Sequence, residues 1–188
     1  ETLITQPDGS LIERRDDVIT ADFDQPKVSL AAKIDAGNGT LINLNGSYRY
    51  YWFRYKLDDE RSLPGAVDRN RRYREKEHGG NYELGGDLAF KLVGGQLKLI
   101  GLTRGNDGPS TNEAIVSYAD GRPDTGDRYD QQQHFNETIA RAEYGWKAGG
   151  ADWQLSAEAA YNTLDVDAGL AALDSGGVFV PVPFPDGS

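Results

Sequence analysis

The chain has 188 residues, of which 20 are basic and 30 acidic, giving a formal net charge of −10. This charge argues against a nucleic-acid partner, because such binding depends on cationic side chains that neutralise phosphates. Cysteine is absent, which excludes disulfides and thiolate metal sites, and there is no run of about 18 apolar residues that would predict a transmembrane helix.

The first third of the chain predicts a polar N-terminal loop and then two strands. Residues 1–27 are rich in turn-forming residues, and a short hairpin is plausible around Pro7-Asp8-Gly9. Alternating apolar positions predict strands over 28–36 and 40–57, joined by a tight Gly-Asn-Gly turn at 37–39. The alternation changes phase after Trp52, which predicts a β-bulge there.

The rest of the chain predicts four more strands and three long loops. Residues 58–80 form a charged loop, which is followed by strands over 81–92 and 97–104 that are joined at 93–96. A loop over 105–135 leads to a hairpin with strands at 136–147 and 153–163, and residues 164–188 form the last long loop. The predicted fold class is therefore all-β: an antiparallel up-and-down meander of about six strands in three hairpins.

Short turns alternate with long loops along the predicted meander. This asymmetry is typical of outer-membrane barrels, which have short turns on the periplasmic side and long loops outside. It predicts that residues 1–188 are part of a larger transmembrane β-barrel, with one face towards lipid and the other towards a polar lumen. The alternative is a soluble sheet whose apolar face is covered by a second layer.

Two sets of residues follow from this alternation. Aromatic side chains near both kinds of connection predict lipid-facing girdles, consisting of Tyr48, Tyr50, Trp52, Tyr82, Phe90, Tyr144, Trp146, Trp153 and Tyr161. Polar side chains at the opposite positions predict a lumen-facing set, consisting of Lys33, Arg49, Glu83, Asp87, Arg141, Glu143 and Glu158. Within this set, Arg141 and Glu158 are expected to pair across the last hairpin.

Several segments of the sequence resemble the barrel of a TonB-dependent outer-membrane receptor of sphingomonad-like Gram-negative bacteria. They are PDGSLIERRDDV (7–18), REKEHGGNYELGGDLAF (74–90), LKLIGL (97–102), SYADGRPDTGDR (117–128) and IARAEYGWKAGGADWQLSAEAAYN (139–162). The resemblance covers most of the chain but includes no catalytic motif. Signal peptide, TonB box and plug domain are not recognisable, and six strands would be about a quarter of such a barrel.

The resemblance implies a function in nutrient uptake across the cell outer membrane. The ligand would be a ferric chelate, a vitamin or a glycan. Its implied partners are outer-membrane lipid, the rest of the barrel, a plug domain, the small nutrient ligand and the TonB complex, which would act through the missing N-terminal part. The alternative function is a soluble or surface β-sandwich or jelly-roll module that binds a ligand such as a glycan, through Tyr50, Trp52 and Tyr55.

No pattern in the sequence predicts an enzyme, a cofactor or a metal site. His78 and His134 lack the spacing of zinc ligands, and the Asp residues between 120 and 130 are too sparse for a calcium loop. No GxSxG motif accompanies the serines. The basic cluster at 69–74 is expected to be a solvated loop, with attraction of an anionic siderophore or a lipopolysaccharide phosphate as the alternative.

Overall fold

The computed structural model describes residues 1–184, and within them the backbone forms nine β-strands and no helix. All strand pairs are antiparallel. The strands are β1 (Thr2–Thr5), β2 (Leu11–Asp24), β3 (Lys27–Gly37), β4 (Thr40–Ser62), β5 (Arg69–Leu92), β6 (Gly95–Tyr118), β7 (Thr125–Ala148), β8 (Ala151–Leu173) and β9 (Phe179–Val182).

All nine strands belong to one open sheet, with the order β1-β2-β4-β5-β6-β7-β8-β9 and β3 beside β4. β4 changes its partner half-way along, because β3 pairs with its first part up to Arg49 and β2 pairs with it from Trp52 onward. The predicted antiparallel meander is confirmed, but about six strands is too few for the whole sheet. Six of the nine, β3 to β8, reach the end that carries the shortest turns.

The five central strands are much longer than the sequence predicted. β4 to β8 each have 23 or 24 residues, so the long loops predicted over 58–80, 105–135 and 164–188 are wrong. The observed connections are only 63–68, 119–124 and 174–178. The predicted loop over 1–27 is also mostly strand, since β1 and β2 pair there as a hairpin. Residues 185–188 of the last predicted loop lie outside the described residues.

The long strands escaped prediction because their outer parts carry charged residues on both faces, which hides the alternation of apolar and polar side chains. The charges are compensated across the ladder instead. Asp58 lies opposite Arg72, and its Oδ1 is 2.7 Å from Nη2 of Arg74. The backbone hydrogen bonds of a strand do not depend on apolar side chains, so pairing continues through these segments.

The pairing of β4 with β5 runs from Leu41 to Arg61 without a shift in register. The bulge predicted after Trp52 is therefore wrong, and Trp52 and Phe53 point to opposite sides of the sheet. We call face A the side that bears Leu44, Leu88, Ala140 and Ala157, and face B the side that bears Arg49, Glu83, Arg141 and Glu158. The change of phase at Trp52 is a change in which face is apolar.

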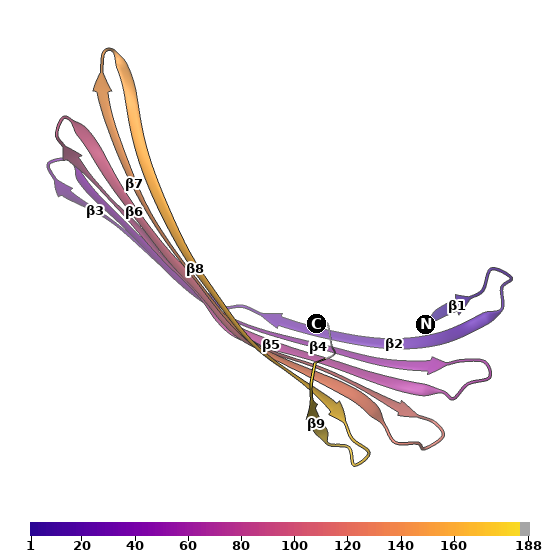
Figure 1. The fold of residues 1–188 in the computed structure, drawn as a ribbon. Helices are drawn as coiled ribbons and strands as arrows, with labels where there is room; N and C mark the ends of the chain where they lie inside the picture. Colours follow the sequence, from indigo (N-terminus) through magenta and orange to yellow (C-terminus); the bar gives the residue numbers. More distant parts are fainter. Residues whose placement is uncertain (185–188) are drawn as a thin grey trace.

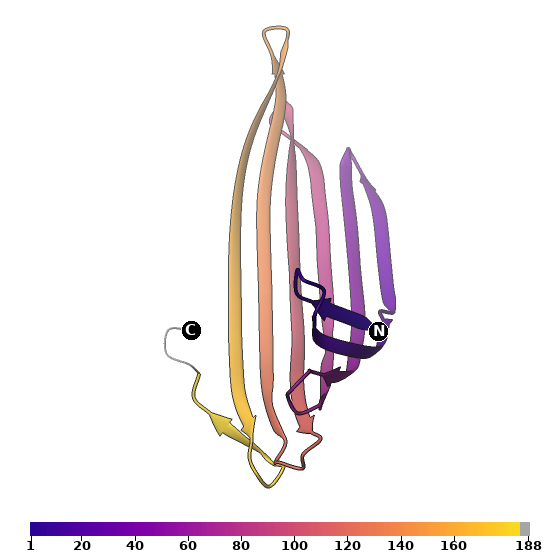
Figure 2. The same ribbon diagram turned by 90° about the vertical axis from the view of Figure 1, so that its right-hand side faces the viewer.

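The sheet is a single curved layer that bends near its middle, close to the link between β2 and β3 (Figure 1). From β3 to β8 the strands run side by side along its length (Figure 2). We call the part between the bend and the short turns the turn-side half, and the part beyond Trp52 the loop-side half. Among the described hydrophobic side chains only Ala89 and Ala171 are buried, so the sheet has no packed core.

The three shortest turns share one backbone geometry. Each has two consecutive residues with positive φ: Asn38 and Gly39 (51° and 78°), Val93 and Gly94 (39° and 75°), and Gly149 and Gly150 (61° and 78°). Positive φ at both central positions is the requirement of a type I′ hairpin turn, whose twist matches that of the flanking strands. Asn and Gly tolerate this conformation, whereas a β-branched residue such as Val93 is strained in it.

We expect the substitution Val93→Asn to stabilise the protein by about 1 kcal/mol, because it relieves this strain. Val93 is 90% exposed, so its removal costs no packing. The check is urea unfolding of the purified, folded protein. The reverse substitution in the equivalent turn, Asn38→Val, should lower the free energy of unfolding by a similar amount. A neutral or destabilising result for Val93→Asn would contradict the assigned turn geometry.

Candidate functional site

The nine aromatic residues predicted as girdles all lie on face A. Four of them are near the short turns, where Trp146 lies opposite Trp153 and their rings stack at 6.4 Å. The other five lie near the bend, where Tyr48 is opposite Tyr82. The remaining members of the two groups are Phe90 and Tyr144 at the short turns, and Tyr50, Trp52 and Tyr161 near the bend.

A continuous apolar belt separates the two aromatic groups. It carries large exposed side chains, and Leu30 and Leu155 are 78% and 66% exposed. On β8 the belt extends from Trp153 to Tyr161, eight residue steps or about 27 Å along the strand. A tilted transmembrane strand needs roughly 9–11 residues to cross a bilayer, so the length of this belt is suited to one lipid bilayer.

Glycines beside the aromatic rings let the rings lie flat across neighbouring strands. A Cβ added at Gly105 would come within 2.5 Å of the Tyr82 ring, and the Tyr82 hydroxyl reaches past it to donate to Oδ1 of Asn136 at 2.7 Å. Similarly, Tyr144 lies against Gly95 and donates to the carbonyl of Val93 at 2.9 Å. These contacts fix the ring positions at the two margins of the belt.

Face B of the turn-side half carries many charged side chains, and several of them form ion pairs. All seven residues predicted to face a lumen lie on it. Arg141 and Glu158 are opposite each other, with Nη1 3.7 Å from Oε2, and Arg141 also lies 2.7 Å from Glu143. Lys98 and the pair Arg104–Glu137 extend this set. The sequence reasoning missed Lys98 and Arg104 because their strand contains apolar residues on both faces.

The polarity of the two faces reverses in the loop-side half. On face A, β4 continues with Arg54, Lys56 and Asp58, whereas on face B it continues with Phe53 and Tyr55. The same reversal occurs on β7 and β8, where Phe135 and Leu164 are opposite each other on face B. The loop-side half is therefore not an extension of the apolar belt.

Face B of the loop-side half contains a polar hollow between β4 and β7. It is lined by Tyr51, Glu75, Glu77, Asn106, Gly108, Ser110, Asn112, Gln131 and Gln133. The Tyr51 hydroxyl donates to Oε1 of Glu77 at 3.0 Å, and Tyr73 donates to Oδ1 of Asn112 at 2.7 Å. Burial raises the pKa of Tyr73, so its hydroxyl remains a donor at physiological pH.

Glycine and proline shape the floor of this hollow. The ladder between β5 and β6 skips His78 and Gly79, where the facing Pro109 has no N–H to donate. A Cβ at Gly108 would come within 2.5 Å of the Tyr51 hydroxyl. The small residues thus allow Tyr51 to lie across β6 and to hold Glu77.

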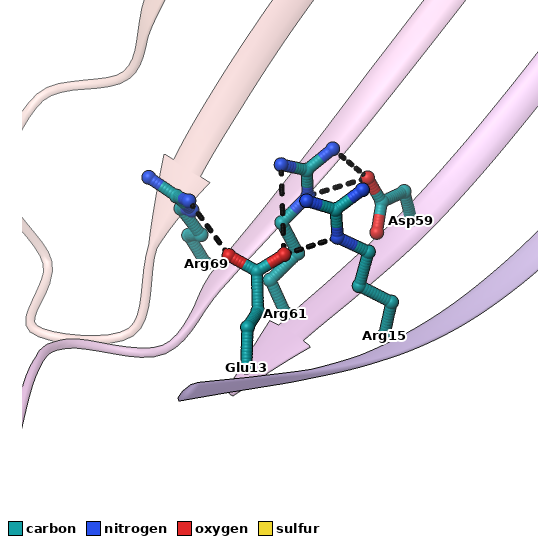
Figure 3. Close-up of polar contacts among 5 residues, drawn as sticks. All are labelled: Glu13, Arg15, Asp59, Arg61 and Arg69. Carbon is teal, nitrogen blue, oxygen red and sulfur yellow. Dashed lines mark hydrogen bonds and ion pairs between the residues drawn. The ribbon is translucent and has the colours of Figure 1, made fainter. Parts of the chain in front are cut away.

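A cluster of two carboxylates and three arginines links β2, β4 and β5 at the far end of face B (Figure 3). Asp59 is 1% exposed and pairs with Arg61. Glu13 pairs with Arg15 and lies 3.3 Å from Arg69. The hydrogen bond from Arg15 lowers the pKa of Glu13, so the stabilisation it gives is present above about pH 4.3 and is lost as the pH falls through the lowered pKa.

Three of the histidine and aspartate candidates form separate contacts with neighbouring charged side chains. Nδ1 of His134 is 3.5 Å from Asp107, and Asp120 and Asp130 each pair with an arginine two residues away. Among residues 1–184, no three His, Cys, Asp or Glu side chains gather in a way that could hold a metal ion. The same residues contain no helix long and apolar enough to cross a membrane.

Comparison with known proteins adds no family. No protein-family model matches the chain, and no curated protein matches its sequence. Among solved structures, the membrane pore complex of pneumolysin, determined by cryo-electron microscopy, aligns over 87% of this chain at 8% identity. The aligned region spans 32% of that protein's chain, and the TM-score is 0.17. A similarity this low carries no argument about fold or function.

We expect Asp59→Asn to destabilise the loop-side half by on the order of 3 kcal/mol, because it removes the nearest charged partner of the mostly buried Arg61 and leaves only Glu13 at 3.9 Å. Hydrogen exchange of the β2 and β4 amides would measure this loss. The matched control is Asp152→Asn, since the Asp152–Lys147 pair is largely exposed and should contribute less than about 1 kcal/mol. Equal effects of the two substitutions would show that the buried cluster does not hold β2 in place.

Proposed function

We propose that this chain is a section of the wall of a transmembrane β-barrel, in a TonB-dependent outer-membrane receptor that takes up a ferric chelate, a vitamin or a glycan. One observation carries the proposal: an exposed apolar belt on face A is bordered on both sides by aromatic residues, while the opposite face is charged. Lipid covers such a belt without a second protein layer, and the aromatic rings sit at its two interfaces.

The alternative of a soluble sandwich receives no support from the arrangement of the strands. A sandwich needs a second sheet packed on the apolar face, but the nine strands of residues 1–184 form one sheet. Left in water, the belt would expose an apolar patch with Leu30, Leu44, Leu84 and Leu155 on its surface. Soluble monomers rarely expose patches of more than a few hundred Å².

Face B then faces the barrel interior. Its charges at the level of the belt pair across strands, as in Arg141–Glu158 and Arg104–Glu137, which makes this surface compatible with water and with a polar plug. The short turns would lie on the periplasmic side and the loop-side half would project outside the cell. This section of wall would position ligand and plug and perform no chemistry itself, while the TonB complex would act through the plug.

In fractionated native cells, we expect an antiserum against residues 105–133 to detect the protein in the outer-membrane fraction. Folded barrels resist unfolding in detergent at room temperature, so the band should migrate differently in unboiled and boiled samples. A band in the soluble fraction whose mobility does not change on boiling would overturn the proposal.

A pair of adjacent substitutions tests which face meets lipid. Ala157 lies midway between Trp153 and Tyr161 on face A, and Ser156 lies next to it on face B. Ala157→Arg should lower the free energy of unfolding in lipid vesicles by about 2–4 kcal/mol, as an arginine at the bilayer midplane does. Ser156→Arg should have a much smaller effect. Equal tolerance of both changes would contradict a lipid-facing belt.

A further inference from the structure

The polar hollow between β4 and β7 lies in the half of the sheet that, under the proposed function, projects outside the membrane on the interior face. Its nine lining residues start with Asn106 and Tyr51, close to the bend, and the others continue away from the belt. A ligand entering from outside would reach this surface before it reached the belt. The inference below rests on the proposed function for this orientation.

The side chains that line the hollow are rich in neutral hydrogen-bonding groups. Four are carboxamides and two are hydroxyl groups, and two are carboxylates, but none is a lysine or arginine. Ser110, Gln131 and Gln133 make no side-chain hydrogen bond with another described residue, so their donors and acceptors can serve a ligand.

Aromatic side chains flank the hollow on the same face. Phe53 lies opposite Glu77, and Tyr55 lies opposite Glu75. On the other side, Phe135 is opposite Asn106 and Tyr129 is opposite Asn112. An aromatic side chain can pack against the apolar C–H face of a ring in a ligand. The neighbouring polar groups can then bind the edge of that ligand ring.

We infer that the hollow binds an uncharged polyhydroxylated ligand, such as a segment of a neutral oligosaccharide. A sugar ring offers hydroxyls that both donate and accept, which matches carboxamides and carboxylates placed side by side. An anionic ferric chelate is disfavoured, because Glu75 and Glu77 would repel it and no cation of the lining would compensate. A cationic ligand would compete with the hydrogen bond from Tyr51 to Glu77.

The test uses the full-length protein, purified from membranes in detergent, on an array of neutral and acidic glycans. We expect binding to at least one neutral oligosaccharide, with the affinity then measured by titration calorimetry. Ferric citrate and spermidine serve as the anionic and cationic probes. Binding of either of these two probes at the hollow, or binding of no neutral glycan, would overturn the inference.

Substitutions place the ligand in the hollow. Gln131→Leu and Gln133→Leu should each weaken binding of the neutral oligosaccharide about tenfold, as expected for the loss of one or two ligand hydrogen bonds. The control is Gln154→Leu, which changes the same residue type on face B at the short-turn end and should leave affinity unchanged. All variants must keep the heat-dependent gel mobility of the folded protein. If Gln131→Leu and Gln133→Leu fold but bind the oligosaccharide with unchanged affinity, the hollow is not the binding site.

Failure of this inference is distinguishable from failure of the proposed function. A heat-modifiable outer-membrane protein that binds ferric citrate, but no neutral glycan, would contradict the inference and leave the receptor assignment intact. A soluble protein without this mobility shift would overturn the receptor, whatever it binds.

Discussion

The constant antiparallel register of β4 to β8 is the constraint on which the rest of the structure depends. Because side chains alternate strictly along each strand, a shift of one residue between neighbours would exchange the two faces. Because none of these strand pairs shifts its register, the aromatic residues of β4, β5, β7 and β8 meet on face A and the charges meet on face B. Both surfaces follow from this pairing and need no packed core.

The reversal of polarity near the bend gives the two halves different tasks under the proposed function. In the turn-side half, the outward face is suited to lipid and the inward face is held by ion pairs. In the loop-side half, the outward face is charged and suited to water, while aromatic and carboxamide side chains gather inside. Near Pro26, in the link between β2 and β3, the neighbour of β4 changes from β3 to β2. The polarity of the two faces reverses at the same level, so β4 would pass from lipid to water as a single strand.

The sequence predicted most of the turn-side half well because its strands other than β6 have one apolar and one polar face. Ala140, Ala142, Tyr144 and Trp146 alternate with Arg141, Glu143 and Gly145, and the four share one face of the sheet as expected. The loop-side half could not be predicted in the same way. A segment with charged residues on both faces, such as the one around Arg72, has the sequence pattern of a solvated loop. Only the cross-strand pairing shows that it is a strand. The hollow was also hidden, since Tyr51, Asn106 and Gln131 come from strands that are distant in sequence.

The sheet formed by residues 1–184 is open, so its two edge strands have backbone groups without a neighbouring strand. Within residues 1–184, β3 pairs with β4 alone, and β8 is covered on its outer side by β9 only from Leu170 to Leu173. Along the belt, both outer strands therefore present rows of unpaired N–H and C=O groups, which cost several kcal/mol each in hydrocarbon. Such edges are templates for strand addition. Under the proposed function, insertion would therefore have to be coupled to pairing of both edges with further strands, and where that pairing fails, the same edges would drive aggregation.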